Sequence, residues 1–267
     1  DMHFFNGSYP GKLPMVLGHE SAGIVEQVGS DVHYVKPGDH VITCLSVFCG
    51  HCEQCVTGHL SLCQEPEMSR GGEEEPRISQ NDQPLTPFAQ LGSFAEMMLV
   101  HEHALVKVRK DMPMDRAALI GCGVTTGVGA VIHTAAVEPG STVAVIGCGG
   151  IGLSAINGAA LAGASRIIAV DMVSSKLELA RKFGATDVVD ASDGEAIEKV
   201  RELNGGGVHY SFEAIGLKAT AEQAFRMLRP GGTATVIGMI PPGQMVELHG
   251  VDFLAEKKIQ GSMMGSN

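Results

Sequence analysis

Four cysteines lie close together, at Cys49, Cys52, Cys55 and Cys63. Their C-x2-C-x2-C-x7-C spacing suits zinc, because four thiolates bind the ion tetrahedrally at about 2.3 Å and short steps let one loop surround it. Four protein ligands leave no open coordination position, so the sequence predicts a structural zinc site. An iron–sulfur cluster is the alternative, although the bacterial ferredoxin pattern places its fourth cysteine after three residues, followed by proline, and here seven residues intervene.

A glycine-rich turn, Gly147-Cys148-Gly149-Gly150-Ile151-Gly152, has the G-x-G-x-x-G spacing of dinucleotide-binding loops. It directly follows an expected strand and opens an expected helix, which is the context that this motif requires. Gly147 permits the tight turn, Gly149 lets the backbone approach a pyrophosphate, and Gly152 allows close packing of helix and strand. The helix N-terminus adds free N–H groups and partial positive charge. The turn therefore predicts a dinucleotide-binding site.

Asp171 ends the second expected strand of this region, nineteen residues after Gly152. A carboxylate there binds both ribose hydroxyls and repels a 2′-phosphate, and no arginine immediately follows it, so NAD is favoured over NADP. S-adenosylmethionine methyltransferases share a glycine-rich turn and an acidic second-strand end, and they are the alternative. The six expected strands and the zinc-type cysteine spacing favour a dehydrogenase.

The pattern of apolar residues and turns along the chain changes near residue 124. Before it, glycine-rich turns separate short apolar alternations at 21–28, 39–43 and 95–100, which is typical of a β-rich domain. After it, strand and helix patterns alternate, which predicts right-handed βαβ units and a buried parallel sheet with helices on both faces. We expect a β-rich domain in residues 1–123 and a Rossmann-type α/β domain in residues 124–267. The expected elements of the second domain are strands at 142–146, 166–170, 187–189, 208–214, 233–237 and 258–263, and helices at 151–164, 174–183, 194–203 and 219–228.

Composition narrows the partners and the compartment. Lys and Arg number 19 against 30 Asp and Glu, and the net charge of −11 repels a phosphate backbone, so no nucleic-acid partner is expected. No apolar run reaches the roughly 18 residues of a membrane span, so no membrane partner is expected. Crowded cysteines without a signal peptide favour metal binding in a reducing cytoplasm over a disulfide scaffold. The polar segment 65–87, which includes Glu73-Glu74-Glu75, predicts a solvated surface loop.

Two further motifs connect these features to a known family. Gly18-His19-Glu20, followed by Gly23 and Gly29, resembles the zinc signature of the zinc-dependent alcohol dehydrogenases in the medium-chain dehydrogenase/reductase superfamily. Ile120-Gly121-Cys122-Gly123 resembles that family's junction motif, and the cysteine cluster resembles its structural-zinc lobe. The likeness covers essentially all of the chain. It implies a GroES-like catalytic domain, a Rossmann coenzyme domain, and an oxidoreductase that interconverts a small alcohol with an aldehyde or ketone using NAD, as a homodimer or homotetramer.

The resemblance also implies individual roles. His19 and Cys122 would bind a catalytic zinc, and Glu20 would lie beside that metal or replace a ligand. Asp1 would orient His19 through its second ring nitrogen, as carboxylates near metal sites do, and His3 would be the outer end of a proton relay. The implied cofactor-binding residues are Thr126, Gly147, Gly149, Gly150, Ile151, Gly152, Asp171 and Lys176, with Thr126 and Ile151 on the nicotinamide and Lys176 at the adenosine ribose.

The family pattern extends beyond both ends of the chain. Its first catalytic cysteine precedes the position of Asp1, and a segment after Asn267 returns to the catalytic domain, so the resemblance implies an incomplete catalytic domain and site. One alternative is a class III-type enzyme for S-(hydroxymethyl)glutathione, which needs a basic pocket that the sequence does not place. Another is a non-catalytic fragment that binds zinc and NAD. The presence together of His3, His19, Glu20 and Cys122 favours the enzyme.

Overall fold

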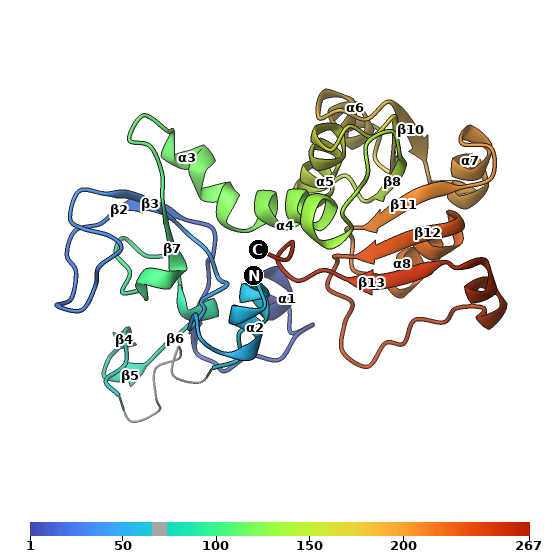
Figure 1. The fold of residues 1–267 in the computed structure, drawn as a ribbon. Coiled ribbons are helices and arrows are strands. Elements are labelled where there is room, and N and C mark those ends of the chain that lie inside the picture. Colours follow the sequence, from blue (N-terminus) through green and yellow to red (C-terminus); the bar gives the residue numbers. More distant parts are fainter. Residues whose placement is uncertain (66–73) are drawn as a thin grey trace. The chain divides into compact units, whose positions relative to one another are not determined.

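The computed structural model describes residues 1–65 and 74–267, which form two compact units, Asp1–Cys122 and Gly123–Asn267 (Figure 1). The division lies one residue before the boundary expected from the sequence. The expected surface loop 65–87 falls partly on residues 66–73, which lie outside the described residues. Its later part contains a short antiparallel pair, β4 (Ser79–Gln80) and β5 (Gln83–Pro84), whose residues are exposed.

The first unit is built on short strands. Its largest sheet pairs β3 (His40–Thr43) antiparallel with β2 (Ala22–Ile24) on one side and β7 (Leu105–Lys107) on the other. The alternations at 21–28 and 39–43 thus contain β2 and β3. The remaining elements are β1 (Met15–Val16), β6 (Thr86–Pro87), α1 (Met2–Phe5), α2 (Glu53–Val56), α3 (Met114–Ala117), η1 (Leu60–Leu62), η3 (Phe88–Gln90), η4 (Glu102–Ala104) and η5 (Ala118–Gly121).

The apolar alternation at 95–100, which is typical of a β-rich domain, forms no strand. The segment forms bends, and Met97 and Leu99 are 70% and 63% exposed. An alternating apolar pattern stabilises a strand only when a neighbouring strand pairs with it and one of its faces is covered. Neither condition holds here among the described residues, because no strand of the first unit pairs with this segment.

The second unit contains a six-stranded parallel sheet in the order β10-β9-β8-β11-β12-β13. This is the doubly wound order of dinucleotide-binding domains, in which the chain reverses direction across the sheet between its first and fourth strands. The strands are β8 (Thr142–Ile146), β9 (Arg166–Asp171), β10 (Asp187–Asp190), β11 (Val208–Glu213), β12 (Leu228–Val236) and β13 (Lys258–Gly261). The helical elements are α4 (Gly123–Gly129), η6 (Ala130–Thr134), α5 (Gly150–Leu161), α6 (Ser174–Lys182), α7 (Ala196–Leu203), α8 (Lys218–Arg226) and η7 (Gly250–Ala255).

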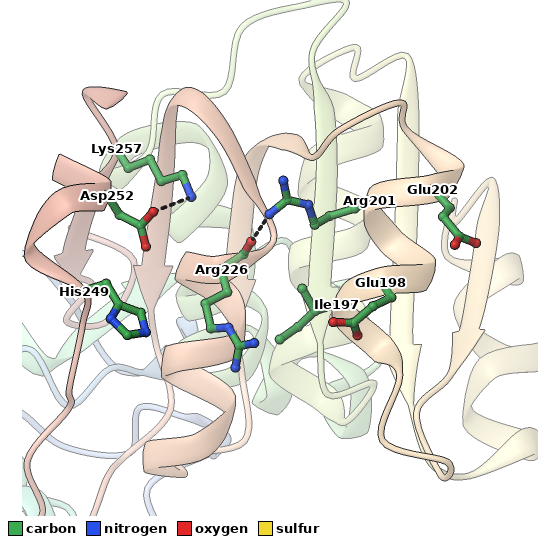
Figure 2. Close-up of a pocket in the computed structure, with 8 residues that line it drawn as sticks. All are labelled: Ile197, Glu198, Arg201, Glu202, Arg226, His249, Asp252 and Lys257. Carbon is green, nitrogen blue, oxygen red and sulfur yellow. Dashed lines mark hydrogen bonds and ion pairs between the residues drawn. The ribbon is translucent and has the colours of Figure 1, made fainter. Parts of the chain in front are cut away.

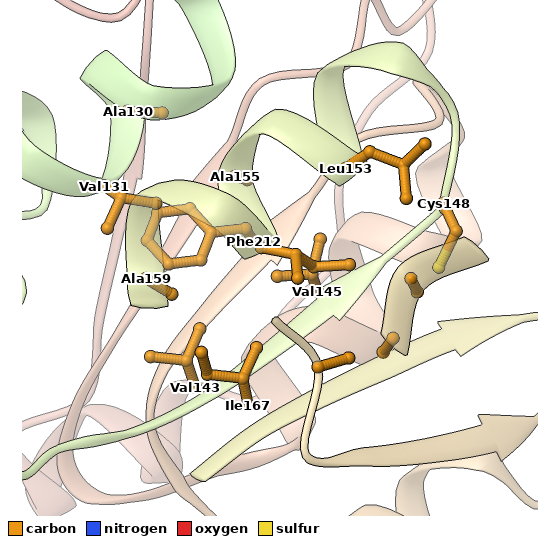
Figure 3. Packing of buried hydrophobic residues seen from close by; sticks show 14 of the residues in the cluster. Ala130, Val131, Val143, Val145, Cys148, Leu153, Ala155, Ala159, Ile167 and Phe212 are labelled. Carbon is orange, nitrogen blue, oxygen red and sulfur yellow. The ribbon is translucent and has the colours of Figure 1, made fainter. Parts of the chain in front are cut away.

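Helices cover both faces of this sheet, as expected. Val143 and Val145 of β8 belong to the core on one face, where Phe212, Ala155 and Ala159 pack with them (Figure 3). The intervening β8 residues, 144 and 146, belong to the core on the other face, with α7 and α8. Because successive side chains of a strand point to opposite faces, a strand buried on both sides is apolar throughout. That is the pattern read from residues 142–146.

No single helix in the described part of the chain is long and apolar enough to cross a membrane. Two consecutive helical stretches, Met114–Gly121 and Gly123–Thr134, are long and apolar enough only when they are counted together across the break between them.

Candidate functional site

The four cysteines of the first unit form a compact group whose ligand atoms all lie within 4.8 Å of one another. The sulfur atoms of Cys49 and Cys55 are 3.8 Å apart, and those of Cys52 and Cys63 are 4.0 Å apart. A tetrahedron with zinc–sulfur bonds of about 2.3 Å has edges of about 3.8 Å. The four thiols therefore fit one zinc ion, and they are too close together to surround a cluster of several irons.

Local structure holds these cysteines in place. Cys52 precedes the first residue of α2, Cys55 lies within that helix, and Cys63 follows η1. Cys49 accepts hydrogen bonds at its sulfur from the backbone N–H groups of His51 and Cys52, at 3.5 and 3.3 Å. Burial opposes ionisation of Cys49, but these donors outweigh it and lower its pKa to about 7. Burial raises the pKa of Cys55 to about 12, so binding of the metal must displace its proton.

His19 is held by Asp1. The Asp1 carboxylate contacts His19 Nδ1 at 3.0 Å through one oxygen and accepts the Gly18 N–H at 2.8 Å through the other. Gly18 has φ +97°, and a Cβ there would lie 2.6 Å from the backbone nitrogen of Phe94. Burial lowers the pKa of His19, which favours its neutral form. No hydrogen bond reaches its Nε2 within residues 1–65 and 74–267, so this nitrogen can bind a metal.

The other expected residues of the catalytic zinc are less closely grouped. Cys122 follows η5, and a Cβ on the preceding Gly121 would lie 1.8 Å from the carbonyl oxygen of Thr43, so this junction packs on the end of β3. Among the described residues, the four-cysteine cluster is the one group of three or more metal-ligating side chains. His19, Glu20 and Cys122 do not form a second such group, and their ligand roles stay predictions. His3 lies in α1, half-buried, with its ring 5.6 Å from that of Tyr9.

The glycine-rich turn joins β8 to α5 in the second unit. Gly147 has φ +93°, and a Cβ on Gly152 would lie 1.7 Å from the Gly147 carbonyl oxygen. These two glycines are therefore required by the fold. A Cβ on Gly149 or Gly150 would meet nothing within 4 Å. The middle of the loop has an open face at a helix N-terminus, which fits the approach of a pyrophosphate.

Asp171 lies at the end of β9, and its carboxylate braces the loop. One of its oxygens accepts the Cys148 N–H at 2.8 Å, and the other accepts the Val173 N–H at 3.0 Å. The sequence did not foresee this bracing. The Cys148 side chain is 1% exposed, and burial together with the Asp171 charge raises its pKa to about 12, so it packs in the core as an unreactive thiol. Lys176 is exposed in the first turn of α6.

Two residues expected at the nicotinamide lie on neighbouring helices. Ile151 is the second residue of α5, and a Cβ on Gly127 of α4 would lie 2.4 Å from the Ile151 carbonyl oxygen. Thr126, also on α4, is buried and donates through its hydroxyl to the sulfur of Met264 at 3.6 Å. The fold brings the two helices together, while the roles of Thr126 and Ile151 toward a cofactor stay predictions.

A pocket of about 500 Å³ on the second unit contains none of the expected site residues (Figure 2). Three cationic side chains and three carboxylates line it together. Arg201 donates to the backbone carbonyl of Arg226 at 3.3 Å, and Lys257 lies 3.6 Å from Asp252. Such balanced charge does not specify a class of ligand. The lining residues are Ile197, Glu198, Arg201, Glu202, Arg226, His249, Asp252 and Lys257.

The sequence reasoning also missed Glu213, the last residue of β11. Its side chain is 0% exposed, and one of its oxygens accepts three hydrogen bonds. The available signal was a carboxylate that directly follows Phe212 at the end of an expected strand and is followed three residues later by Gly216.

Comparison with known proteins agrees with both units. Residues 1–110 match the family described as alcohol dehydrogenase GroES-like domain, and residues 150–267 match the zinc-binding dehydrogenase family. The chain is 38% identical over 274 residues to alcohol dehydrogenase class-3 of Oryza sativa subsp. japonica, covering 99% of this chain and 72% of that protein. It is 40% identical over 276 residues to an S-(hydroxymethyl)glutathione dehydrogenase of Escherichia coli (strain UTI89 / UPEC), covering 99% and 74%.

Solved structures give the same result. Benzyl alcohol dehydrogenase from Acinetobacter calcoaceticus superposes with a TM-score of 0.90 at 35% identity, covering 100% of this chain and 74% of that chain. A zinc-binding dehydrogenase from Sinorhizobium meliloti 1021, bound to NADP, superposes with a TM-score of 0.82 at 30% identity, covering 98% and 72%.

Proposed function

The chain belongs to the zinc-dependent alcohol dehydrogenases of the medium-chain dehydrogenase/reductase superfamily, and from that premise we propose which residues carry its reaction. It is an oxidoreductase that interconverts small alcohols with aldehydes or ketones by hydride transfer to and from NAD. In the forward direction, an alcohol and NAD⁺ give a carbonyl compound, NADH and a proton. Zinc is held by the four-cysteine cluster, where it has a structural role because no coordination position is left open.

The Asp1–His19 contact carries our proposal for the catalytic centre. The Asp1 carboxylate contacts His19 Nδ1 at 3.0 Å, so Nε2 is the ring nitrogen left to bind a metal. The same carboxylate makes Nε2 a better metal ligand. We assign His19 Nε2 and Cys122 Sγ as ligands of a second zinc. The exposed Glu20 carboxylate directly follows His19 in the sequence. Zinc in such a site lowers the pKa of an alcohol hydroxyl and stabilises charge on the substrate oxygen. His3 accepts the released proton on its imidazole ring, which is half-buried in α1.

The nucleotide is assigned to the second unit. The N–H groups at the start of α5, beside the open positions Gly149 and Gly150, receive the pyrophosphate. Asp171 accepts hydrogen bonds from the ribose hydroxyls and repels a 2′-phosphate, so NAD is preferred over NADP. Lys176 supports the adenosine ribose, and Thr126 and Ile151 contact the nicotinamide. We place the catalytic domain in residues 1–123 and the coenzyme domain in residues 124–267.

A second candidate substrate is S-(hydroxymethyl)glutathione, because relatives named S-(hydroxymethyl)glutathione dehydrogenase are about as similar to the chain as other alcohol dehydrogenases are. Benzyl alcohol represents the other class of substrate, because the structural neighbour from Acinetobacter calcoaceticus is a benzyl alcohol dehydrogenase. Turnover of a panel containing both compounds, with short primary alcohols, decides between them. We further propose a homodimer or homotetramer in the cytoplasm, which size-exclusion chromatography and cell fractionation test.

The His19→Ala variant tests the catalytic assignment. It removes the metal-binding nitrogen that Asp1 orients, so we expect one zinc equivalent to be lost and alcohol oxidation to fall by at least about 100-fold. NAD binding should stay unchanged, since the glycine-rich loop belongs to the other unit. His33→Ala, at an exposed histidine of the same unit, is the control and should behave as wild type. Alcohol oxidation at a near-normal rate in His19→Ala would remove His19 from the catalytic centre.

A further inference from the structure

Glu213 is a fully buried carboxylate at the carboxyl end of the central sheet. It ends β11 and lies in register with Ile146 of β8, the residue before the glycine-rich loop, and with Val236 of β12. Its side chain is 0% exposed. Removal of an ionisable group from water is costly unless hydrogen bonds or charges compensate, so a carboxylate at this position requires an explanation.

The hydrogen bonds that offset the cost of burying Glu213 all reach one oxygen of its carboxylate. Glu213 Oε1 accepts the N–H groups of Ile215 at 2.9 Å and Gly216 at 2.8 Å, and the hydroxyl of Thr220 at 2.8 Å. These donors belong to the turn after β11 and to the first turn of α8, a helix with no other side-chain cap at its start. The carboxylate therefore fixes this turn relative to the strand. Glu213 Oε2 is buried and has no hydrogen-bond partner within residues 1–65 and 74–267.

The turn that Glu213 holds touches the glycine-rich loop. A Cβ on Gly147 would lie 2.5 Å from Cγ1 of Ile215, so the two turns pack directly on each other. Ala214 donates its N–H to the Ile146 carbonyl at 2.9 Å, which links the same two strand ends. Ile215 is 43% exposed and offers an apolar surface next to the loop. A shift of this turn changes both the surface beside the loop and the support of Gly147.

We infer that Glu213 is a positioning residue for the nucleotide: its buried carboxylate holds Ile215 against the glycine-rich loop and so keeps the loop in the conformation that binds the nucleotide. The inference rests on the proposed assignment of the nucleotide to this loop. Glu213 itself touches no ligand and acts through Ile215 and Gly147. A carboxylate that only stabilised the fold would affect unfolding and leave nucleotide affinity unchanged.

Calorimetric titration of the whole chain with ADP-ribose tests the inference, because this probe occupies the nucleotide site without any turnover. Glu213→Ala leaves the Ile215 and Gly216 N–H groups without their acceptor, while the Thr220 hydroxyl keeps the Leu217 carbonyl at 3.0 Å, and we expect ADP-ribose to bind about tenfold more weakly. Glu213→Gln keeps an oxygen for the three donors and replaces the oxygen without a partner by an NH2 group, so we expect its affinity for ADP-ribose to stay within about twofold of wild type. The KM for NAD should rise in Glu213→Ala while the KM for alcohol stays constant.

Ser211→Ala is the matched control. Ser211 is also buried on β11 and donates to the Ala224 carbonyl of α8 at 2.7 Å, away from the turn. It should lower the thermal midpoint without weakening ADP-ribose binding. If Glu213→Ala does not fold, Thr220→Val removes one of the three donors and should weaken ADP-ribose binding about two- to threefold.

The outcomes separate the two proposals. Wild-type chain that binds no ADP-ribose would overturn the proposed nucleotide site and this inference with it. If wild type binds ADP-ribose tightly and Glu213→Ala binds it equally tightly, only the role of Glu213 is overturned. Where Glu213→Ala does not fold, equally tight binding by Thr220→Val overturns that role.

Discussion

Asp171 has two roles to distinguish, a proposed one in binding the ribose and an observed one in bracing the glycine-rich loop. It lies at the end of β9, where we propose that it binds the ribose, and it also accepts the Cys148 and Val173 N–H groups at 2.8 and 3.0 Å. Substitution by glycine or serine would loosen the loop and remove the charge at once. Asp171→Asn removes the charge and keeps one oxygen for one of the two backbone donors, so it disturbs the loop less than glycine or serine does.

We expect Asp171→Asn to raise the affinity for NADP(H) relative to NAD(H) by about tenfold, because the repulsion between the carboxylate and the 2′-phosphate is lost. Fluorescence titration with NADH and NADPH measures the ratio. Asp193→Asn, which removes an exposed carboxylate between β10 and α7, is the control and should leave the ratio unchanged. Equal affinity of the unmodified chain for both nucleotides would contradict the assignment of Asp171.

Cys55 tests the structural zinc site, because it is the buried member of the four-cysteine group. Cys55→Ala leaves three thiols, and we expect elemental analysis to show the loss of one zinc equivalent. Cys148→Ala is the control, since it removes a buried cysteine that lies outside the cluster. Unchanged zinc content in Cys55→Ala, or iron in place of zinc in the wild-type chain, would show that the cluster has another role.

At the scale of elements, the junction between β8 and α5 combines glycines that packing requires with glycines that leave space for a ligand. Gly152 allows the helix to start against the Gly147 carbonyl, where a Cβ would lie 1.7 Å away. Gly149 has φ −80°, which any residue adopts, and open space around it. Alanine at the two positions should therefore act on different properties of the protein.

We expect Gly152→Ala to destabilise the second unit by roughly 1–3 kcal/mol through overpacking, and to weaken nucleotide binding as a consequence. Gly149→Ala should leave the free energy of unfolding within about 0.5 kcal/mol of wild type and still weaken ADP-ribose binding, because its methyl group occupies the approach to the backbone. Urea unfolding and calorimetric titration measure the two effects. Normal ADP-ribose binding by Gly149→Ala would mean that the pyrophosphate does not approach this face.

At the scale of the whole molecule, the metal site and the nucleotide site that we propose lie in different units. The four cysteines belong to Asp1–Cys122, and the glycine-rich loop belongs to Gly123–Asn267. Metal binding and nucleotide binding each stabilise the folded form of the unit that contains the site. Thermal unfolding should therefore respond separately to chelation and to nucleotide.

We expect a chelator to lower the unfolding temperature of the first unit and leave that of the second unchanged. ADP-ribose at 100 times its Kd should stabilise the second unit by about 2.7 kcal/mol and raise only its transition. Scanning calorimetry with and without each addition measures both. A single transition that moves with both additions would show that the units unfold as one.

The sequence by itself determined the features that depend on neighbours along the chain. The apolar run 142–146, the glycine spacing after it and the later alternation of strands and helices predicted the parallel sheet, because side-chain period and turn chemistry act locally. The expected strands and helices of the second unit begin and end within a few residues of the observed ones, except that β12 starts at Leu228, five residues early. The cysteine spacing likewise predicted the zinc cluster, since one loop carries all four ligands.

The tertiary structure decided what depends on partners far apart in the chain. The alternation at 95–100 has the pattern of a strand and forms none, because no strand pairs with it. The bracing of the loop by Asp171 joins residues 23 positions apart, and the Ile215–Gly147 packing joins residues further apart still. The burial of Glu213 depends on the strands on both sides of it and on α8. A residue's type and spacing state which chemistry it can perform, but only the packed sheet determines which backbone its atoms meet and whether water reaches them.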